Sequence, residues 1–351
     1  MIRRLAAAAA LLTLVLITAG GLVTNTDSGL ACPDWPLCFG SPLPKMVGGV
    51  AVEHTHRLIA TALGFLTVAL VVLTLRRARE GRLAALAAAA ATALLGAAFW
   101  AAHVKYATGE VPQAAVAVVL AAFAGCIAIA ARASRLDGKL AVGALALVLL
   151  QGLLGGATVL YRLPPTVLIL HLGTSMLYLT AATVLAWQVN AGAAVHPVAG
   201  RGLLWATAVA IYFQILLGAT VRHTGAGLVC TDLPLCRGAL WPLHVHPSVH
   251  LHMLHRAFAF VVLALVAVTS RRLARETRGP VRALALAAPA LVLLQIALGV
   301  ATILTFKDLV PVTAHLLVGA LLLCTFVSLL ALTQPAAAAA RAHGRALDLA
   351  A

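Results

Sequence analysis

The sequence predicts an all-α integral membrane protein of about ten transmembrane helices, forming two parallel, pseudo-twofold-related four-helix bundles plus an extra helical hairpin. Three observations favour this fold class. Of the 351 residues, 62% are hydrophobic and only 10% are charged, which is far outside the usage of soluble proteins. The apolar residues gather in runs of roughly 20, the length that a helix needs to cross a bilayer. The second part of the chain also repeats the first.

Ten apolar segments define the expected helices, because backbone that crosses a membrane must satisfy its own hydrogen bonds. They cover residues 5–24, 51–75, 83–102, 111–131, 139–160, 167–189, 202–221, 250–270, 283–304 and 312–333. The first segment could instead be a cleaved signal peptide, since two arginines precede it and small residues follow. We favour a retained helix, because the apolar run is longer than a usual signal core and has an internal counterpart later in the chain.

Basic residues indicate which helix ends are cytoplasmic. If the N-terminus is cytoplasmic, that side holds 17 of the 25 Lys and Arg residues, in agreement with the positive-inside rule. We therefore expect a multi-pass protein of the inner (plasma) membrane with both termini inside, including a cytoplasmic tail over 334–351. The net charge of +15 lies in short loops between the apolar runs, so we expect membrane lipid and no nucleic acid as partner.

An internal duplication relates the two halves of the chain. A shift of 198 residues aligns GLACPDWPLC with GLVCTDLPLC. Each half begins on the cytoplasmic side, so the repeats are parallel and related by an axis along the membrane normal. The expected parts are an N-terminal half over 1–190, an extra hairpin within it at about 83–131, and a C-terminal half over 201–333.

Four histidines occupy matching places in the two halves. A shift of 199 residues places His56 on His255, and a shift of 144 places His171 on His315. Each lies in the first turns of a span entered from the outer face, and ionisable groups inside a membrane usually mark function. Two imidazoles that face each other across a helical bundle suit a haem iron. Hydrogen bonding between helices is the structural alternative, and zinc is weaker because each half offers only two histidines.

An arginine follows one histidine of each half. Arg57 comes directly after His56, and Arg256 directly after His255. Each guanidinium could pair with a haem propionate through a two-pronged hydrogen bond. The alternative is that a long basic side chain simply extends toward the membrane surface.

A carboxylate breaks the symmetry between the halves. Glu53 lies three residues before His56, and residues at that spacing share a helix face. The other half has His252 in that place. A proton-handling group in only one half predicts that the chemistry happens there. The alternative is a structural ion pair of Glu53 with Arg57 or His54.

Two outer loops carry cysteine pairs with the same spacing. GLACPDWPLC holds Cys32 and Cys38, and GLVCTDLPLC holds Cys230 and Cys236. Disulfides persist on the outer side of a membrane, and each pair would close a small ring over the mouth of its half. A structural staple and a redox-active pair are both open interpretations. A zinc site of four thiolates would require the two loops to converge.

Together these motifs resemble the haem A synthase family. The resemblance rests on GLACPDWPLC, EHTHR, GLVCTDLPLC, HMLHR, HLGTS and AHLLVG, and it spans nearly the whole chain except residues 83–131. It implies an oxidoreductase that oxidises the C8 methyl group of haem O to a formyl group, which gives haem A for cytochrome oxidase. The family usually has eight spans, and this chain has ten.

The resemblance also implies roles for single residues. His255 and His315 would be the axial ligands of a haem b cofactor, and His56 and His171 those of the substrate haem iron. Glu53 would be catalytic. The paired cysteines of the family match Cys32–Cys38 and Cys230–Cys236.

The expected partners are the haem O substrate, haem O synthase, an electron donor that the sequence does not name, and further copies of the chain in a homo-oligomer. The rival function is a diheme b-type electron-transfer cytochrome of the membrane without haem-modifying activity. Glu53, which stands in only one half, favours the enzyme. A transporter fits less well, because the repeats are not inverted.

Overall fold

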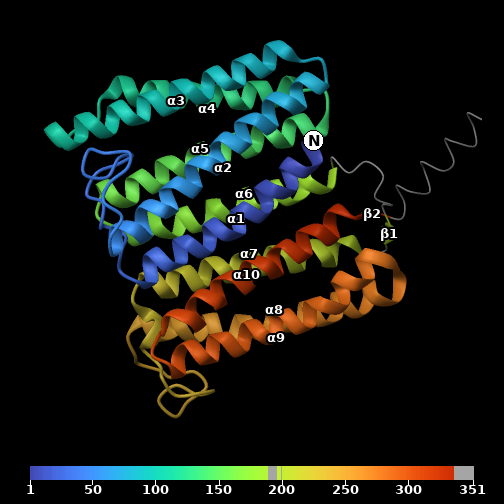
Figure 1. Ribbon diagram of the computed structural model, residues 1–351. Coiled ribbons are helices and arrows are strands. Elements are labelled where there is room, and N and C mark those ends of the chain that lie inside the picture. The colour runs from blue at the N-terminus through green and yellow to red at the C-terminus, as the bar shows by residue number, and fades with distance from the viewer. Residues whose placement is uncertain (189–195, 199, 336–351) are drawn as a thin grey trace, which may run out of the picture. The chain divides into compact units, whose positions relative to one another are not determined.

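A computed structural model of the chain describes residues 1–188, 196–198 and 200–335 (Figure 1). Ten helices in these described residues are long and apolar enough to cross a membrane. The predicted class, an α-helical integral membrane protein, is therefore confirmed. The chain divides into two compact units, Met1–Val189 and Asn190–Ala351, called unit 1 and unit 2 below.

Unit 1 contains the first six helices of the chain. They are α1 (Ile2–Asn25), α2 (Gly49–Arg77), α3 (Gly81–Thr108), α4 (Gln113–Arg132), α5 (Leu136–Leu160) and α6 (Pro165–Gln188). Helix α1 packs against α2 and α6, and α5 packs against the same two helices. These four helices therefore form a ring in which α2 and α6 are diagonally opposite.

The hairpin of α3 and α4 lies outside this ring. The two helices pack on each other, α3 also contacts α2, and α4 also contacts α5 (Figure 1). The contact surface is rich in alanine, with Ala84, Ala87 and Ala91 of α3 all buried, and small side chains let helix backbones approach closely. Gly109 ends α3 with φ of +80°, a left-handed conformation that glycine adopts without steric cost.

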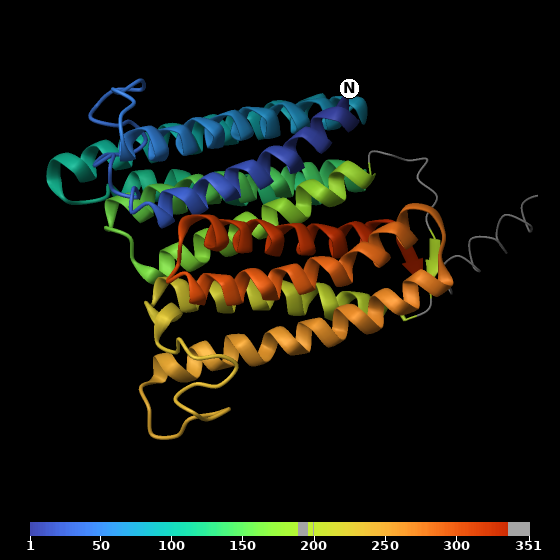
Figure 2. The same ribbon diagram turned by 60° about the horizontal axis from the view of Figure 1, so that its bottom comes forward.

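Unit 2 contains the remaining four long helices. They are α7 (Arg201–His223), α8 (Pro247–Glu276), α9 (Gly279–Leu304) and α10 (Leu309–Ala331), with a short 3-10 helix η1 (Ala226–Leu228) after α7. Helix α7 packs against α8 and α10, and α9 packs against the same two helices (Figures 1 and 2). Unit 2 is thus also a ring, with α8 and α10 diagonally opposite.

Two short strands were not predicted. β1 (His196–Val198) pairs in parallel with β2 (Thr333–Pro335), and His196 lies opposite Thr333. One strand precedes the first helix of unit 2 and the other follows its last helix, so the ring brings both to the same end of the unit. Three residues per strand are too few to show a period-two pattern in the sequence.

Several helices also run beyond the predicted apolar segments. Helix α8 continues to Glu276, although its apolar run ends near residue 270, and α3 continues to Thr108. A helix satisfies its own backbone hydrogen bonds in water as well as in lipid, so hydropathy marks only the part inside the bilayer.

Candidate functional site

The four paired histidines come from diagonally opposite helices of their rings. His56 lies on α2 and His171 on α6, whereas His255 lies on α8 and His315 on α10. All four side chains are only partly buried. Since the main contacts of each ring join neighbouring helices, the two histidines of each unit belong to opposite walls of the same bundle.

Each imidazole lies with its edge against a glycine of the neighbouring helix. In every case the ring atom nearest to the position that a glycine Cβ would occupy is Cε1. The pairs and distances are Gly20–His56 at 3.1 Å, Gly155–His171 at 3.3 Å, Gly218–His255 at 2.9 Å and Gly299–His315 at 3.1 Å. The same local arrangement therefore occurs four times, twice in each unit.

The ring nitrogens have few protein partners. His315 Nδ1 lies 2.9 Å from the backbone carbonyl oxygen of Gln295, and a carbonyl only accepts, so Nδ1 carries the proton and Nε2 keeps its lone pair. The buried Nδ1 atoms of His56 and His255 have no hydrogen-bond partner. These features fit ligation of a haem iron by imidazole.

A polar contact joins the opposite walls of unit 1 deeper in the bundle. The hydroxyl groups of Thr67 on α2 and Tyr178 on α6 are 2.5 Å apart and buried. Thr67 lies eleven residues beyond His56, which is roughly 16 Å along a helix. The hydrogen bond therefore joins α2 and α6 at a point well separated from the histidines along the helices, on the side away from the cysteine loop.

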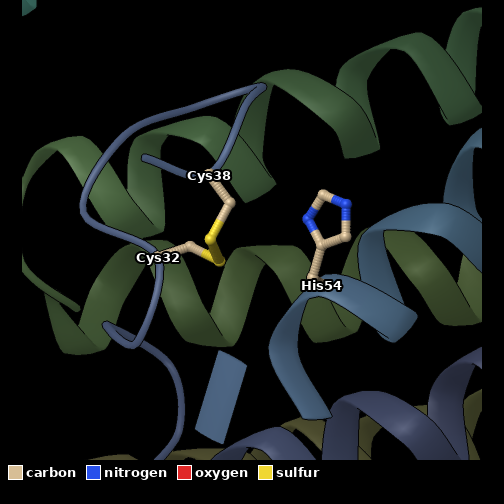
Figure 3. Close-up of side chains that lie close together, drawn as sticks. All are labelled: Cys32, Cys38 and His54. Carbon is tan, nitrogen blue, oxygen red and sulfur yellow. A yellow bond between two sulfur atoms is a disulfide. The ribbon is translucent and has the colours of Figure 1, made fainter. Parts of the chain in front are cut away.

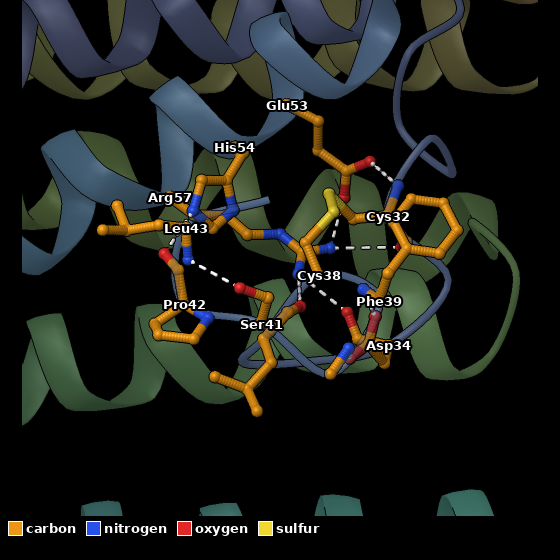
Figure 4. The surroundings of a disulfide bond; sticks show 12 residues. Cys32, Asp34, Cys38, Phe39, Ser41, Pro42, Leu43, Glu53, His54 and Arg57 are labelled. Atoms are coloured by element: carbon orange, nitrogen blue, oxygen red, sulfur yellow. Dashed lines mark hydrogen bonds and ion pairs between the residues drawn. A yellow bond between two sulfur atoms is a disulfide. The ribbon is translucent and has the colours of Figure 1, made fainter. Parts of the chain in front are cut away.

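Arg57 holds the first cysteine loop (Figure 4). Its guanidinium donates to the backbone carbonyls of Asp34 at 2.7 Å, of Leu37, and of Cys32 at 3.3 Å. It also forms an ion pair with Glu53. Sequence reasoning missed this role in holding the loop, although the recurrence of an arginine and a cysteine loop in both halves was a signal for it. The pairing of Arg57 with a haem propionate stays a prediction.

Glu53 connects helix α2 to the same loop. Glu53 is 3% exposed, and its Oε2 accepts a hydrogen bond of 2.8 Å from the backbone N–H of Cys32. Its Oε1 faces Arg57. The ion pair that sequence analysis named as the structural alternative is thus present, and the catalytic role of Glu53 stays a prediction.

Unit 2 repeats this arrangement without a carboxylate. Arg256 donates to the carbonyls of Asp232 at 3.0 Å, Leu235 at 3.2 Å and Cys230 at 2.5 Å. In place of Glu53, the buried His252 accepts from Arg256 Nε at 3.3 Å. The loop-holding arginine is therefore common to both units, whereas, within the residues that the structure describes, the buried acid at this place belongs to unit 1 alone.

Both cysteine pairs form disulfides. Cys32 is bonded to Cys38 and Cys230 to Cys236, with Cα–Cα distances of 4.8 Å and 5.3 Å. His54 lies beside the first pair, and the three potential ligand atoms are within 4.8 Å of one another (Figure 3). Metals bind cysteine as thiolate, and His54 Nε2 already contacts the Pro42 carbonyl at 2.9 Å. In the disulfide state the two sulfur atoms are bonded to each other and are not thiolate ligands for a metal.

A tryptophan extends the first loop across the ring. The Trp35 side chain lies on Gly156 of α5, where an added Cβ would be 2.8 Å from the indole. In unit 2 the repeat places Leu233 where unit 1 has Trp35, and Val300 where unit 1 has Gly156. The pair of a large side chain and a glycine is thus replaced by two side chains of medium size. In unit 1 the loop thus contacts both α2 and α5. This arrangement is consistent with a loop that covers one end of the ring.

The contacts between Arg57 and the first cysteine loop lead to a prediction about the stability of that loop. Replacing Arg57 with Ala removes three charged hydrogen bonds to loop carbonyls, and we expect the free energy of local loop opening to fall by about 2 kcal/mol. Hydrogen exchange at the Cys38 and Ser41 amides, which bond across the loop, should then be roughly 30-fold faster. Arg256→Ala is the matched control, because it should leave these two amides unchanged. Equal exchange in all three proteins would contradict this role of Arg57.

The fold and these sites define a class of protein: a multi-pass membrane protein with two helical rings, each with a histidine pair on opposite walls and a disulfide-closed loop. The chain belongs to the COX15-CtaA family, described as cytochrome oxidase assembly protein, which matches residues 3–48 and 97–327.

Curated relatives agree with this assignment. A "Heme A synthase" of Symbiobacterium thermophilum is 31% identical over 292 residues, which is 78% of each chain. Proteins of the same name from Shouchella clausii and Halalkalibacterium halodurans are 26% and 27% identical. They cover 87% and 89% of this chain, and 88% and 90% of their own lengths is matched.

The family match corrects one expectation. The resemblance was expected to leave out residues 83–131, but the match leaves out 49–96 and includes all of α4 and the end of α3. Both stretches are apolar helical segments of similar length, so composition alone does not decide which is additional. In the structure it is α3 and α4 that lie outside the ring, whereas α2, with Glu53 and His56, is part of it.

Proposed function

We propose that this protein is a haem A synthase, an oxidoreductase that converts the C8 methyl group of haem O to a formyl group. The observation that carries the proposal is the histidine pair on opposite walls of each ring, His56 with His171 and His255 with His315. Membership of a cytochrome oxidase assembly family and the names of the relatives support it.

The two units would have different roles, one binding a haem cofactor and the other binding the substrate. His255 and His315 would hold a haem b cofactor, which supplies electron transfer when bound. His56 and His171 would hold the iron of haem O. The asymmetry that supports this division is Glu53, an acid found only in unit 1, where unit 2 has His252.

Two successive hydroxylations of the methyl group would give a gem-diol, which loses water to form the aldehyde. Each hydroxylation is a two-electron oxidation. Dioxygen would drive it with two electrons from the electron donor and two protons, one oxygen atom leaving as water; alternatively, water would supply the oxygen, two electrons would pass to an acceptor, and two protons would be released. Glu53 would accept the proton released at the substrate. The ion pair with Arg57 and the hydrogen bond from the Cys32 N–H fix the place of the carboxylate at the outer end of α2. The disulfide loop would limit the access of water to this end of the bundle.

The membrane setting completes the proposal. The bias of basic residues supports a plasma-membrane protein with both termini cytoplasmic and the cysteine loops outside. Haem O synthase, an electron donor and further copies of this chain are the proposed protein partners.

The products distinguish this enzyme from a diheme electron-transfer cytochrome, which the likeness of the two histidine pairs also allows. The chain is expressed in cells that make haem O but lack haem A, and extracted haem is examined by mass spectrometry. Appearance of the formyl-bearing haem supports the synthase. A purified protein that binds haem b in both units while only haem O accumulates would identify a cytochrome.

A further inference from the structure

We infer that the glycine facing each histidine is a positioning residue, which lets the imidazole edge lie against the neighbouring helix so that Nε2 is left for the metal. The inference rests on the proposed haem sites and extends them to four residues of this chain. These are Gly20 on α1, Gly155 on α5, Gly218 on α7 and Gly299 on α9.

Among the glycines whose surroundings the structure describes, these four alone face a histidine ring. An added Cβ would meet Cε1 of a histidine at 2.9–3.3 Å in each case. Other helical glycines, such as Gly152 on α5 and Gly202 on α7, have nothing within 4 Å of that position. Glycine weakens a helix interior relative to alanine, so its recurrence opposite each of the four histidines indicates a need for space.

A glutamine four residues earlier adds a second contact in three of the four helices. Gln151 donates its side-chain amide to the backbone carbonyl of His171, and Gln214 donates to that of His255, both at 2.9 Å. On α9, it is the backbone carbonyl of Gln295 that accepts from His315 Nδ1. The segment Gln-x-x-x-Gly therefore contacts both the backbone and the ring of His171 and of His255. On α9 both of its contacts are to the ring of His315.

Helix α1 differs, because Leu16 takes the place of the glutamine. The Leu16 carbonyl lies near the His56 ring, but His56 Nδ1 makes no full hydrogen bond. His56 is thus held by fewer contacts than its counterpart in unit 2. This suits the proposed substrate half, where the bound haem must leave after each reaction.

The direction of the ring is what the glycine controls. With Cε1 against the helix, the two nitrogens flank the contact, and Nδ1 points along the helix toward the backbone carbonyl one turn earlier, as His315 shows. A hydrogen bond at Nδ1 fixes the tautomer of a metal-bound histidine and its orientation. A methyl group on Gly218 would push the ring away, because 2.9 Å is closer than carbon atoms approach.

The test compares Gly218→Ala with Gly202→Ala in the same helix. Haem per polypeptide is measured from the pyridine haemochrome, and the ferric protein is examined by electron paramagnetic resonance. In Gly218→Ala we expect loss of more than half of the haem of unit 2, or a shifted low-spin signal for what remains. Gly202→Ala should match the unchanged protein. Alanine is the better helix former, so helix propensity cannot cause the loss.

The second pair of variants, Gly155→Ala and Gly152→Ala, repeats the comparison in unit 1. The milder contact of 3.3 Å predicts a smaller shift, and the haem signal of unit 2 reports that the chain is folded. If Gly218→Ala does not accumulate, Gly299→Ala tests the same site through its other histidine.

The inference would be overturned if Gly218→Ala had the same haem content and resonance signals as Gly202→Ala. Where Gly299→Ala replaces Gly218→Ala, the same outcome in Gly299→Ala would overturn it. If the wild-type protein bound no haem, the proposed function would be overturned instead.

Discussion

We expect the replacement of Glu53 with Gln to lower haem A formation by at least about 10²-fold while the bound haem is kept. Glutamine is nearly the same size, and its amide oxygen can still accept the N–H of Cys32, which is 2.8 Å from Glu53 Oε2. The amide cannot take up a proton, however. Cells that make haem O and express Glu53→Gln should therefore accumulate haem O, and the purified protein should keep the visible spectrum of the unchanged one.

The control for this experiment is His252→Gln, the same change in unit 2. His252 contacts Arg256 in the place where Glu53 contacts Arg57, so a general effect on the arginine and its loop would appear in both variants. Full activity of Glu53→Gln would refute the catalytic role. Loss of haem together with activity would show that the carboxylate serves mainly to hold the Cys32 loop.

Much of the fold could be predicted because the membrane imposes a simple rule on sequence. Each span must be a helix and must be apolar over roughly 20 residues, so all ten helices were located correctly. Their ends were not, as α8 shows by continuing to Glu276. The duplication also indicated the hairpin of α3 and α4 as the additional pair, because residues 83–131 have no counterpart in the second half of the chain.

The duplication singled out the four histidines as candidate site residues, because the two halves can be aligned from the sequence alone, without knowledge of the structure. It could not predict what each side chain touches. It did not show, for instance, that the Arg57 guanidinium binds backbone carbonyls 20 to 25 residues earlier in the chain; the pairing of Arg57 with a haem propionate stays a prediction. The glycines opposite the histidines were likewise missed, since the contact depends on how neighbouring helices are rotated about their axes.

Replacing His315 with Ala should remove the haem b cofactor from unit 2. The imidazole supplies one of the two proposed ligands, and His315 is the histidine whose Nδ1 proton is fixed by a hydrogen bond, 2.9 Å to Gln295. Even the loss of a supporting contact to a ligand weakens metal binding by roughly 10- to 100-fold, so loss of the ligand itself should have a larger effect. We expect haem b per polypeptide to fall to background and haem A formation to stop.

His171→Ala is the matched variant, because it removes the corresponding ligand of unit 1. It should also stop haem A formation, but the purified protein should keep its haem b, since unit 2 is intact. The two variants thus have equal activities and opposite cofactor contents. If His171→Ala lost haem b and His315→Ala kept it, the assignment of cofactor and substrate to the two units would have to be exchanged. If both kept a low-spin haem of unchanged spectrum, neither histidine would be an axial ligand, because an iron that loses an imidazole changes its spin state or takes a new ligand.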